Sequence, residues 1–314
     1  GIALAFFIRR SAVGRLVAGG MERKAALAAL AGPQDRPAPN WWILGGSVLF
    51  VAFTLGMGFS HIPFNQEIIF GGSFAIIAFL IARLTRELEP EARATLIGTA
   101  IVIFVFRAIP GPGEGLTWWM IDELRFDQRF LAVLSLIASV LTLIGMFLFR
   151  RFMAERSIAY VVGFLTLLGA VLSAPIVGLY YGLHQWTASL TGGVVDARFI
   201  VLVNTALESP LGQIAMIPML AWIANSAPQN LKATYFAIMA SFTNLALSAS
   251  QLGTQYLNHA FIVSREVKDT VTGTITTPAD YGQLGEILVV QLLIAFALPF
   301  IAILIVRSAR LKWA

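Results

Sequence analysis

Two charged residues stand inside apolar segments of this sequence and carry its most specific chemistry. Arg107 follows a run of mostly apolar residues and precedes Pro110–Gly113, which cannot continue a regular helix. If the segment crosses a membrane, the guanidinium costs at least about 2.5–3.5 kcal/mol at bilayer depth, so it calls for a partner or a function. One interpretation is that Arg107 binds an anionic substrate group beside Glu114 and the interrupted backbone. The alternative is an arginine that extends to the membrane surface before a simple loop.

Glu208 is the second charged candidate. Asn204, Glu208 and Gly212 recur every four positions and therefore share one face of a helix. Two prolines in the same segment are expected to kink that helix. A carboxylate in such apolar surroundings can take up and release a proton, which predicts a role in proton coupling. The alternative is a structural ion pair, with Arg107 as a candidate partner.

Small or amide-bearing residues form a stripe with a spacing of three or four positions: Thr234, Ala237, Ser241, Asn244, Ser248, Gln251 and Gln255. A polar stripe on a membrane-spanning helix lines either a water-filled pathway or a tight seam between helices. The small residues Ala237 and Ser241 favour a seam. The amides of Asn244 and Gln251 favour a cavity, and we expect them, with Asn204, to bind a substrate by hydrogen bonds.

Trp118 and Trp119 directly follow the Pro/Gly run. An aromatic belt at the membrane surface explains them without a function, whereas stacking on a planar substrate ring is the functional alternative. The three histidines have no metal-ligand neighbour at helical spacing, and the sequence has no Walker loop, GxSxG or HExxH motif. We therefore expect no catalytic residue, no metal and no cofactor. The basic residues are not clustered, so nucleic acid is not an expected partner.

The composition indicates which elements must position these groups. Of the 314 residues, 58% are hydrophobic and 12% are charged, and there is no cysteine. Soluble domains are roughly 45–50% apolar and about 25% charged. The sequence therefore excludes an ordinary soluble enzyme and a disulfide scaffold, and it predicts an all-α, polytopic membrane bundle.

Eight apolar stretches are candidates for membrane-spanning helices, each of which needs about 20 residues: Trp41–Ser60, Phe64–Ile81, Thr95–Ala108, Phe130–Phe149, Ile158–Leu183, Phe199–Ala224, Ala233–Tyr256 and Ile287–Val306. Most of the 22 Lys and Arg residues fall in alternate connections between these stretches. The positive-inside rule therefore predicts that both ends of the chain are cytoplasmic. The expected location is the cell (inner or plasma) membrane.

The spans divide the chain into three parts. Residues 1–40 are expected to hold the end of a preceding helix, Gly1–Ile8, and a cytoplasmic linker. Residues 41–90 are expected to form a two-helix transmembrane hairpin, and residues 91–314 a six-helix transmembrane bundle. The sequence is thus expected to be a fragment whose missing N-terminal half packs against it.

Two runs of the sequence resemble one known family. FRAIPGPGEGLTWWMIDELRFDQRF (Phe106–Phe130) combines a proline break with an acidic, aromatic segment, and a second run occupies Met216–Leu257. They look like the signature of the folate–biopterin transporter (BT1) family in the major facilitator superfamily. The matching positions of the second run are Pro218, Ala224, Pro228, Thr234, Phe236, Ala237, Ser241 and Asn244. The resemblance covers Ala94–Ala314 and implies twelve helices in two halves around a central cavity, with Trp41–Ile81 as an inserted pair.

These features predict a secondary active transporter that moves a small anionic organic solute, folate or pterin first among them. In this hypothesis Arg107 holds the anion, and Glu208 is the protonatable partner of a proton-coupled symporter that works by alternating access. The alternative is a non-transporting membrane scaffold or assembly factor with a transporter-like fold. A membrane enzyme acting on lipid-linked substrates is disfavoured, because the sequence has no catalytic constellation.

Overall fold

The computed structural model describes residues 13–23, 25, 41–60, 62–211, 232–269, 272–309 and 311. The chain divides into two compact units, Gly1–Trp41 and Trp42–Ala314. In the first unit a helix covers residues 13–18, whereas the predicted helix end Gly1–Ile8 lies outside the described residues. Three positions of the family signature, Pro218, Ala224 and Pro228, also lie outside them, as does Gly212.

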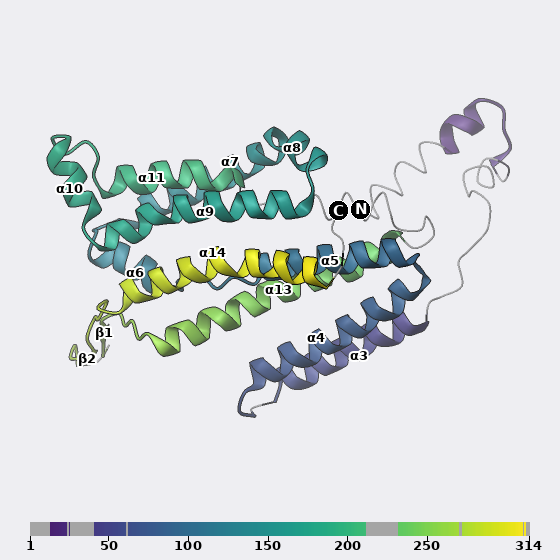
Figure 1. The fold of residues 1–314 in the computed structure, drawn as a ribbon, viewed down its shortest axis with the longest axis horizontal. Helices are drawn as coiled ribbons and strands as arrows, with labels where there is room; N and C mark the ends of the chain where they lie inside the picture. The colour runs from purple at the N-terminus through teal and green to yellow at the C-terminus, as the bar shows by residue number, and fades with distance from the viewer. Residues whose placement is uncertain are drawn as a thin grey trace. The chain divides into compact units, whose positions relative to one another are not determined.

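The second unit is built almost wholly of helices (Figure 1). Its helices are α3 (Trp41–Gly58), α4 (Asn65–Leu84), η1 (Thr85–Glu87), α5 (Pro90–Arg107), α6 (Gly115–Asp122), α7 (Gln128–Leu148), α8 (Arg150–Glu155), α9 (Ile158–Tyr180), α10 (Leu183–Leu190), α11 (Ala197–Glu208), η2 (Ser209–Leu211), α13 (Lys232–Ala260) and α14 (Leu284–Ser308). The two short antiparallel strands are β1 (Val267–Lys268) and β2 (Ile275–Thr277), between α13 and α14. The predicted all-α class is confirmed.

Five of the described helices are long and apolar enough to cross a membrane: α3, α4, α7, α9 and α14. Two further expected spans are helical but more polar. Helix α5 carries Glu91, Arg93 and Arg107 within 18 residues, and α13 carries the polar stripe within 29 residues. The described part of the remaining expected span, α11, has 12 residues, and residues 212–231 lie outside the described chain.

Short acidic side chains fix where two of the helices begin. Asp127 accepts a hydrogen bond from the backbone N–H of Phe130 at 2.7 Å, and Asp196 accepts one from Phe199 at 2.8 Å. Each carboxylate satisfies an N–H that has no partner within its helix. The starts of α7 and α11 are therefore encoded locally.

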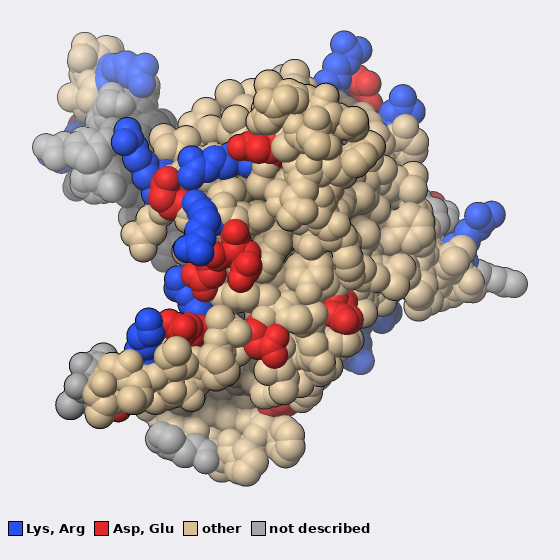
Figure 2. Space-filling view, turned by 90° about the vertical axis from the view of Figure 1, so that its left-hand side faces the viewer, with Lys and Arg blue, Asp and Glu red and all other residues tan. Residues whose placement is uncertain are grey.

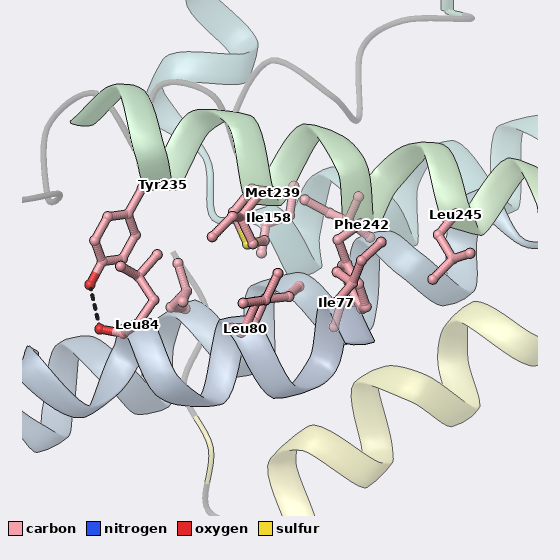
Figure 3. Packing of buried hydrophobic residues seen from close by; sticks show 14 of the residues in the cluster. Ile77, Leu80, Leu84, Ile158, Tyr235, Met239, Phe242 and Leu245 are labelled. Carbon is pink, nitrogen blue, oxygen red and sulfur yellow. Dashed lines mark hydrogen bonds between the residues drawn. The ribbon is translucent and has the colours of Figure 1, made fainter. Parts of the chain in front are cut away.

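The largest hydrophobic cluster joins α4 to α5, α9, α13 and α14. Figure 3 shows the contact between α4 and α13, where Leu80 and Leu84 face Met239 and Tyr235. The Tyr235 hydroxyl donates a hydrogen bond to the carbonyl oxygen of Leu84 at 3.1 Å. Because this phenol is buried, the hydrogen bond offsets the cost of removing its polar group from water. The contact fixes one end of the α4–α13 pair.

Helix α3 packs against α4 and has no buried residue of its own. Trp42 contacts Phe79 edge-on at 6.1 Å between ring centroids, and the Arg83 guanidinium lies 4.6 Å from the centre of the Trp42 ring. Leu44, Val48, Leu49, Val51 and Leu55 are exposed, as is typical of a helix that faces lipid, whereas Ile43 and Phe50 are partly buried against the largest hydrophobic cluster.

Gly145 allows α7 to approach the chain at η2. One helical turn before Gly145, Thr142 donates a hydrogen bond to the Ser209 carbonyl at 2.8 Å. A Cβ atom at position 145 would lie 2.5 Å from Pro210 Cα and still closer to the Pro210 carbonyl oxygen. Since the obstacle is backbone rather than the end of a flexible side chain, it cannot move aside locally.

We expect Gly145→Ala to lower the free energy of unfolding by about 1–3 kcal/mol, the usual cost of overpacking. The matched control is Gly169→Ala in α9, where nothing lies within 4 Å of the added Cβ. This control should be neutral or stabilising by up to about 1 kcal/mol, because alanine favours helix more than glycine. Thermal unfolding of the purified protein in detergent measures both. Equal stability of the two variants would contradict the close contact.

Candidate functional site

The interrupted segment after α5 is held by the side chains of α13. Ser250 donates a hydrogen bond to the Ile109 carbonyl at 2.6 Å, and the Gly111 N–H donates to Thr254 Oγ1 at 2.8 Å. Asn258 reaches the Pro112 carbonyl at 3.4 Å. Backbone groups that a helix would pair internally are thus paired by hydroxyls and an amide of the neighbouring helix.

Close approach accompanies these hydrogen bonds. Gly113 has a φ of 79°, a conformation that other residues adopt rarely, and a Cβ there would lie 2.7 Å from the Asn258 amide nitrogen. On the opposite side of the contact, a Cβ at Gly253 would lie 3.3 Å from Pro110 Cβ. The Pro/Gly run is therefore a packed element of the bundle rather than a free loop.

The polar stripe of α13 faces a cavity of about 460 Å³ next to α3 and α4, which we call the α13 groove. Four predicted members of the stripe line it: Ser241, Asn244, Ser248 and Gln251. Opposite them lie three polar residues that were not predicted as site residues: Thr54 of α3 and Gln66 and Ser73 of α4. Gln66 and Ser73 are seven residues apart in an apolar helix, and this two-turn spacing was a signal that they share a face.

A second cavity, also of about 460 Å³, adjoins the α13 groove and shares Phe50, Ile77 and Ser241 with it. Ala237 lines this second cavity. The seam that we expected at Ala237 and Ser241 is therefore not what the structure has, because both residues border open space instead of a tight helix contact.

No charged side chain lines the α13 groove among the described residues. Its walls combine amides and hydroxyls with the aromatic rings of Phe50 and Phe70. Beside it, the Tyr256 hydroxyl donates a hydrogen bond to Glu67 Oε1 at 2.7 Å, which links α13 to α4 at the end opposite Tyr235. The α13 groove thus suits a planar group that is polar at its edges and uncharged.

Arg107 and Glu114 do not line the α13 groove. Arg107 is the last residue of α5, is half-buried and has a buried Nε atom. Glu114 is exposed immediately before α6, where its carbonyl oxygen accepts a hydrogen bond from the Trp118 N–H at 3.0 Å. The structure thus separates these two residues from the amides of the stripe.

Trp118 and Trp119 belong to a second hydrophobic cluster around α6, α9, α11 and α14. Trp119 is 6% exposed, and its ring centroid lies 5.7 Å from that of Tyr180. Trp118 is partly buried against the same cluster. Both rings therefore contribute to packing at this end of the bundle.

Glu208 lines a smaller cavity of about 170 Å³ together with Pro112 of the interrupted segment. Asn204 is 6% exposed and donates a hydrogen bond from Nδ2 to Glu208 Oε2 at 3.1 Å. The predicted shared face of these two residues is confirmed by this contact. None of the ion pairs between described residues includes Glu208, so the alternative of an ion pair with Arg107 is not what the structure has.

Asp122, at the end of α6, contacts Arg265 and Tyr281 of the connection between α13 and α14. We call these three residues the polar latch. The Arg265 guanidinium contacts the two Asp122 oxygens at 3.1 and 3.3 Å, and the Tyr281 hydroxyl donates to the same carboxylate. Figure 2 looks onto this end of the bundle, where acidic and basic side chains are interspersed. The hydrogen bond from Tyr281, followed by those from Arg265, lowers the pKa of Asp122, and burial raises the pKa of Tyr281.

We expect acid to loosen this latch. Because the pKa of Asp122 is lowered in the folded protein, the contact stabilises the structure above the ordinary aspartate pKa of about 3.9 and is lost as the pH falls through the lowered value. Hydrogen exchange of the described residues between 264 and 280, corrected for intrinsic rates, should therefore speed up as the pH is lowered below the ordinary aspartate pKa. Asp122→Asn should show faster exchange already at neutral pH. Unchanged protection in both experiments would contradict the latch.

Comparisons with known proteins agree with this architecture. A model of the BT1 family matches residues 73–312, beginning within α4. The chain is 27% identical over 186 residues to a folate-biopterin transporter of Synechocystis sp., covering 56% of this chain and 36% of that protein. It is 26% identical over 167 residues to putative folate transporter 2 of Plasmodium berghei, covering 51% of this chain and 34% of that protein.

A third relative is probable folate-biopterin transporter 6 of Arabidopsis thaliana, 23% identical over 155 residues, with 48% of this chain and 30% of that protein covered. The chain spans about a third of the length of these curated relatives. No solved structure matches it significantly. Since the family model covers most of the chain, the resemblance seen in the sequence is confirmed, and the chain belongs to the BT1 family.

Proposed function

We propose that this chain is part of a secondary active transporter that moves a small, folate- or pterin-like organic solute across a membrane by alternating access. The observation that carries the proposal is the α13 groove, a cavity of about 460 Å³ walled by amides, hydroxyls and phenylalanine rings. The names of three relatives as folate or folate-biopterin transporters support the same class of solute.

The chemistry of the α13 groove fits the ring of such a solute. Asn244, Gln251 and Gln66 each offer two N–H donors and one carbonyl acceptor, which can pair with the donor and acceptor edge of a heteroaromatic ring. Phe50 and Phe70 offer faces for the ring itself. Because Trp119 is packed in the core, the proposal assigns ring contacts to these phenylalanines and leaves Trp118, at the cluster's edge, as a further candidate.

The anionic part of the solute is assigned to Arg107. This residue is half-buried at the end of α5, where an unwound segment begins, and a guanidinium binds a carboxylate in two-point geometry. Glu114 lies beside the same segment as a polar neighbour. Unchanged folate uptake by an Arg107→Ala variant would remove this assignment.

Coupling to a proton gradient is assigned to Glu208, oriented by Asn204. The carboxylate lines a cavity shared with the interrupted segment, so a change in its charge acts on an element that can rearrange. The proposal places the chain in a cell membrane with both ends cytoplasmic, as the distribution of basic residues favours. Retained proton dependence of uptake in Glu208→Gln would contradict the coupling role.

Uptake measurements test the proposed solute site in the α13 groove. Replacing Asn244 or Gln251 by Leu removes an amide that forms two hydrogen bonds in the proposal, at about 0.5–1.5 kcal/mol each. We expect the apparent affinity for folate or pterin to fall about tenfold in each variant, with the protein still present in the membrane.

The control variant is Gln255→Leu, which removes an exposed amide from the same helix outside the α13 groove. It should leave the affinity unchanged. Equal losses in Gln255→Leu and the two groove variants would contradict the proposed site. Absence of folate and pterin uptake in the unaltered full-length protein, with co-purification of a complex, would favour the scaffold alternative.

A further inference from the structure

The cavity at Glu208 brings together four parts of the chain that are distant in sequence. Its volume is about 170 Å³, and it is lined by residues of four parts: the segment 112–116, where the interrupted backbone leads into α6, and the helices α9, α11 and α14. The members with polar side chains are Ser173, Glu208 and Gln291, and the others are Pro112, Leu116, Ile176, Val177 and Leu288. A small polar set in an otherwise apolar wall indicates a ligand that is itself small and polar.

The polar groups of this cavity are mainly oxygen donors to a cation. Glu208 supplies a carboxylate, Ser173 a hydroxyl oxygen and Gln291 an amide oxygen. The only polar backbone group of Pro112 is its carbonyl, which receives a long hydrogen bond of 3.4 Å from Asn258 and keeps a second lone pair. No lysine, arginine or histidine is among the described lining residues, so the carboxyl group of Glu208 is the one group of this wall that can carry a charge.

The charge and size of this set favour a monovalent ion. Within the described parts of the chain, no group of three or more His, Cys, Asp and Glu side chains is placed to hold a metal ion, as divalent cations usually require. A single carboxylate balances a single positive charge. The volume of about 170 Å³ accommodates one small ion and a few waters at about 30 Å³ each. Carbonyls of unwound segments are suitable ligands for such an ion within a membrane protein.

We propose that this cavity is a binding site for a small monovalent cation, Na⁺, with Glu208 as the charged ligand and Ser173 and Gln291 as neutral ligands. Asn204 is a positioning residue, because its amide holds Glu208 Oε2 at 3.1 Å and leaves the other carboxylate oxygen to the ion. The link of this ion to transport rests on the proposed function, in which Glu208 couples transport to a proton, and Na⁺ then competes with that proton for the same carboxylate. The binding of Na⁺ can be measured on the purified protein, without a transport assay.

The test is the thermal stability of the purified full-length protein in detergent, in NaCl and in choline chloride of equal ionic strength. A ligand that binds only the folded state raises the Tm, and we expect a rise of about 2–4 °C in NaCl at about ten times its Kd. Glu208→Gln should abolish the rise. Ser173→Ala and Gln291→Leu should each reduce it by more than half. The matched control, Glu155→Gln on α8, removes an exposed carboxylate outside the cavity and should keep the full rise.

Several results would overturn the site. Equal Tm values of the unaltered protein in NaCl and choline chloride would show that Na⁺ does not bind. A rise preserved in Glu208→Gln, Ser173→Ala and Gln291→Leu would show a general salt effect. A larger rise with CaCl₂, lost in Glu208→Gln, would show a divalent site instead. If Glu208→Gln does not fold, the two neutral-ligand variants decide.

The outcome is separable from that of the proposed function. If the protein takes up folate but its Tm does not depend on Na⁺, the cation site is refuted and the proposed transport function is not. A Na⁺-dependent Tm in a protein that takes up no folate or pterin would support the site and refute the proposed solute.

Discussion

The hydrogen bonds from α13 to the segment after α5 are the contacts on which the described bundle depends. A Pro/Gly run between α5 and α6 leaves backbone groups that no helix can pair, and lipid offers no partner for them. Ser250 and Thr254 supply those partners, at 2.6 and 2.8 Å from Ile109 and Gly111. Since the hydroxyls come from one face of α13, this helix has to be polar along part of its length.

The same helix is polar on a second face, and this face is the candidate solute site. Asn244 and Gln251 line the α13 groove. Tyr235 and Tyr256 form hydrogen bonds from the two ends of α13 to α4. The α13 groove carries no charge among its described lining residues. The charges that the proposed function needs lie elsewhere, with Arg107 at the end of α5 and Glu208 at the end of α11. In this proposal, different elements of the chain therefore bind the ring of the solute, its anionic group and the coupling ion.

Much of this arrangement could be predicted from the sequence, because it depends on local patterns. Apolar stretches predicted the helices, and the four-residue spacing predicted the shared face of Asn204 and Glu208, on which the structure has a hydrogen bond between them. Tertiary packing decided the rest. Gln66 and Thr54 belong to other helices than the stripe and meet it only after folding. The burial of Trp119 depends on Tyr180, which is far away in the sequence, and the meeting of Glu208 with Pro112 depends on how α11 packs beside the interrupted segment.

The most direct test of this account is solute protection of single cysteines in the α13 groove, since the 314 residues contain no cysteine of their own. Asn244→Cys and Gln251→Cys place a thiol in the groove, and Leu247→Cys places one at an exposed position of α13 outside its lining. In membranes of cells that produce the full-length protein, a water-soluble thiol reagent should label the two groove positions, and folate or pterin should slow that labelling several-fold. Labelling at position 247 should not respond to the solute. Equal labelling of all three positions, or labelling that the solute does not change, would contradict the assignment of the α13 groove as the solute site.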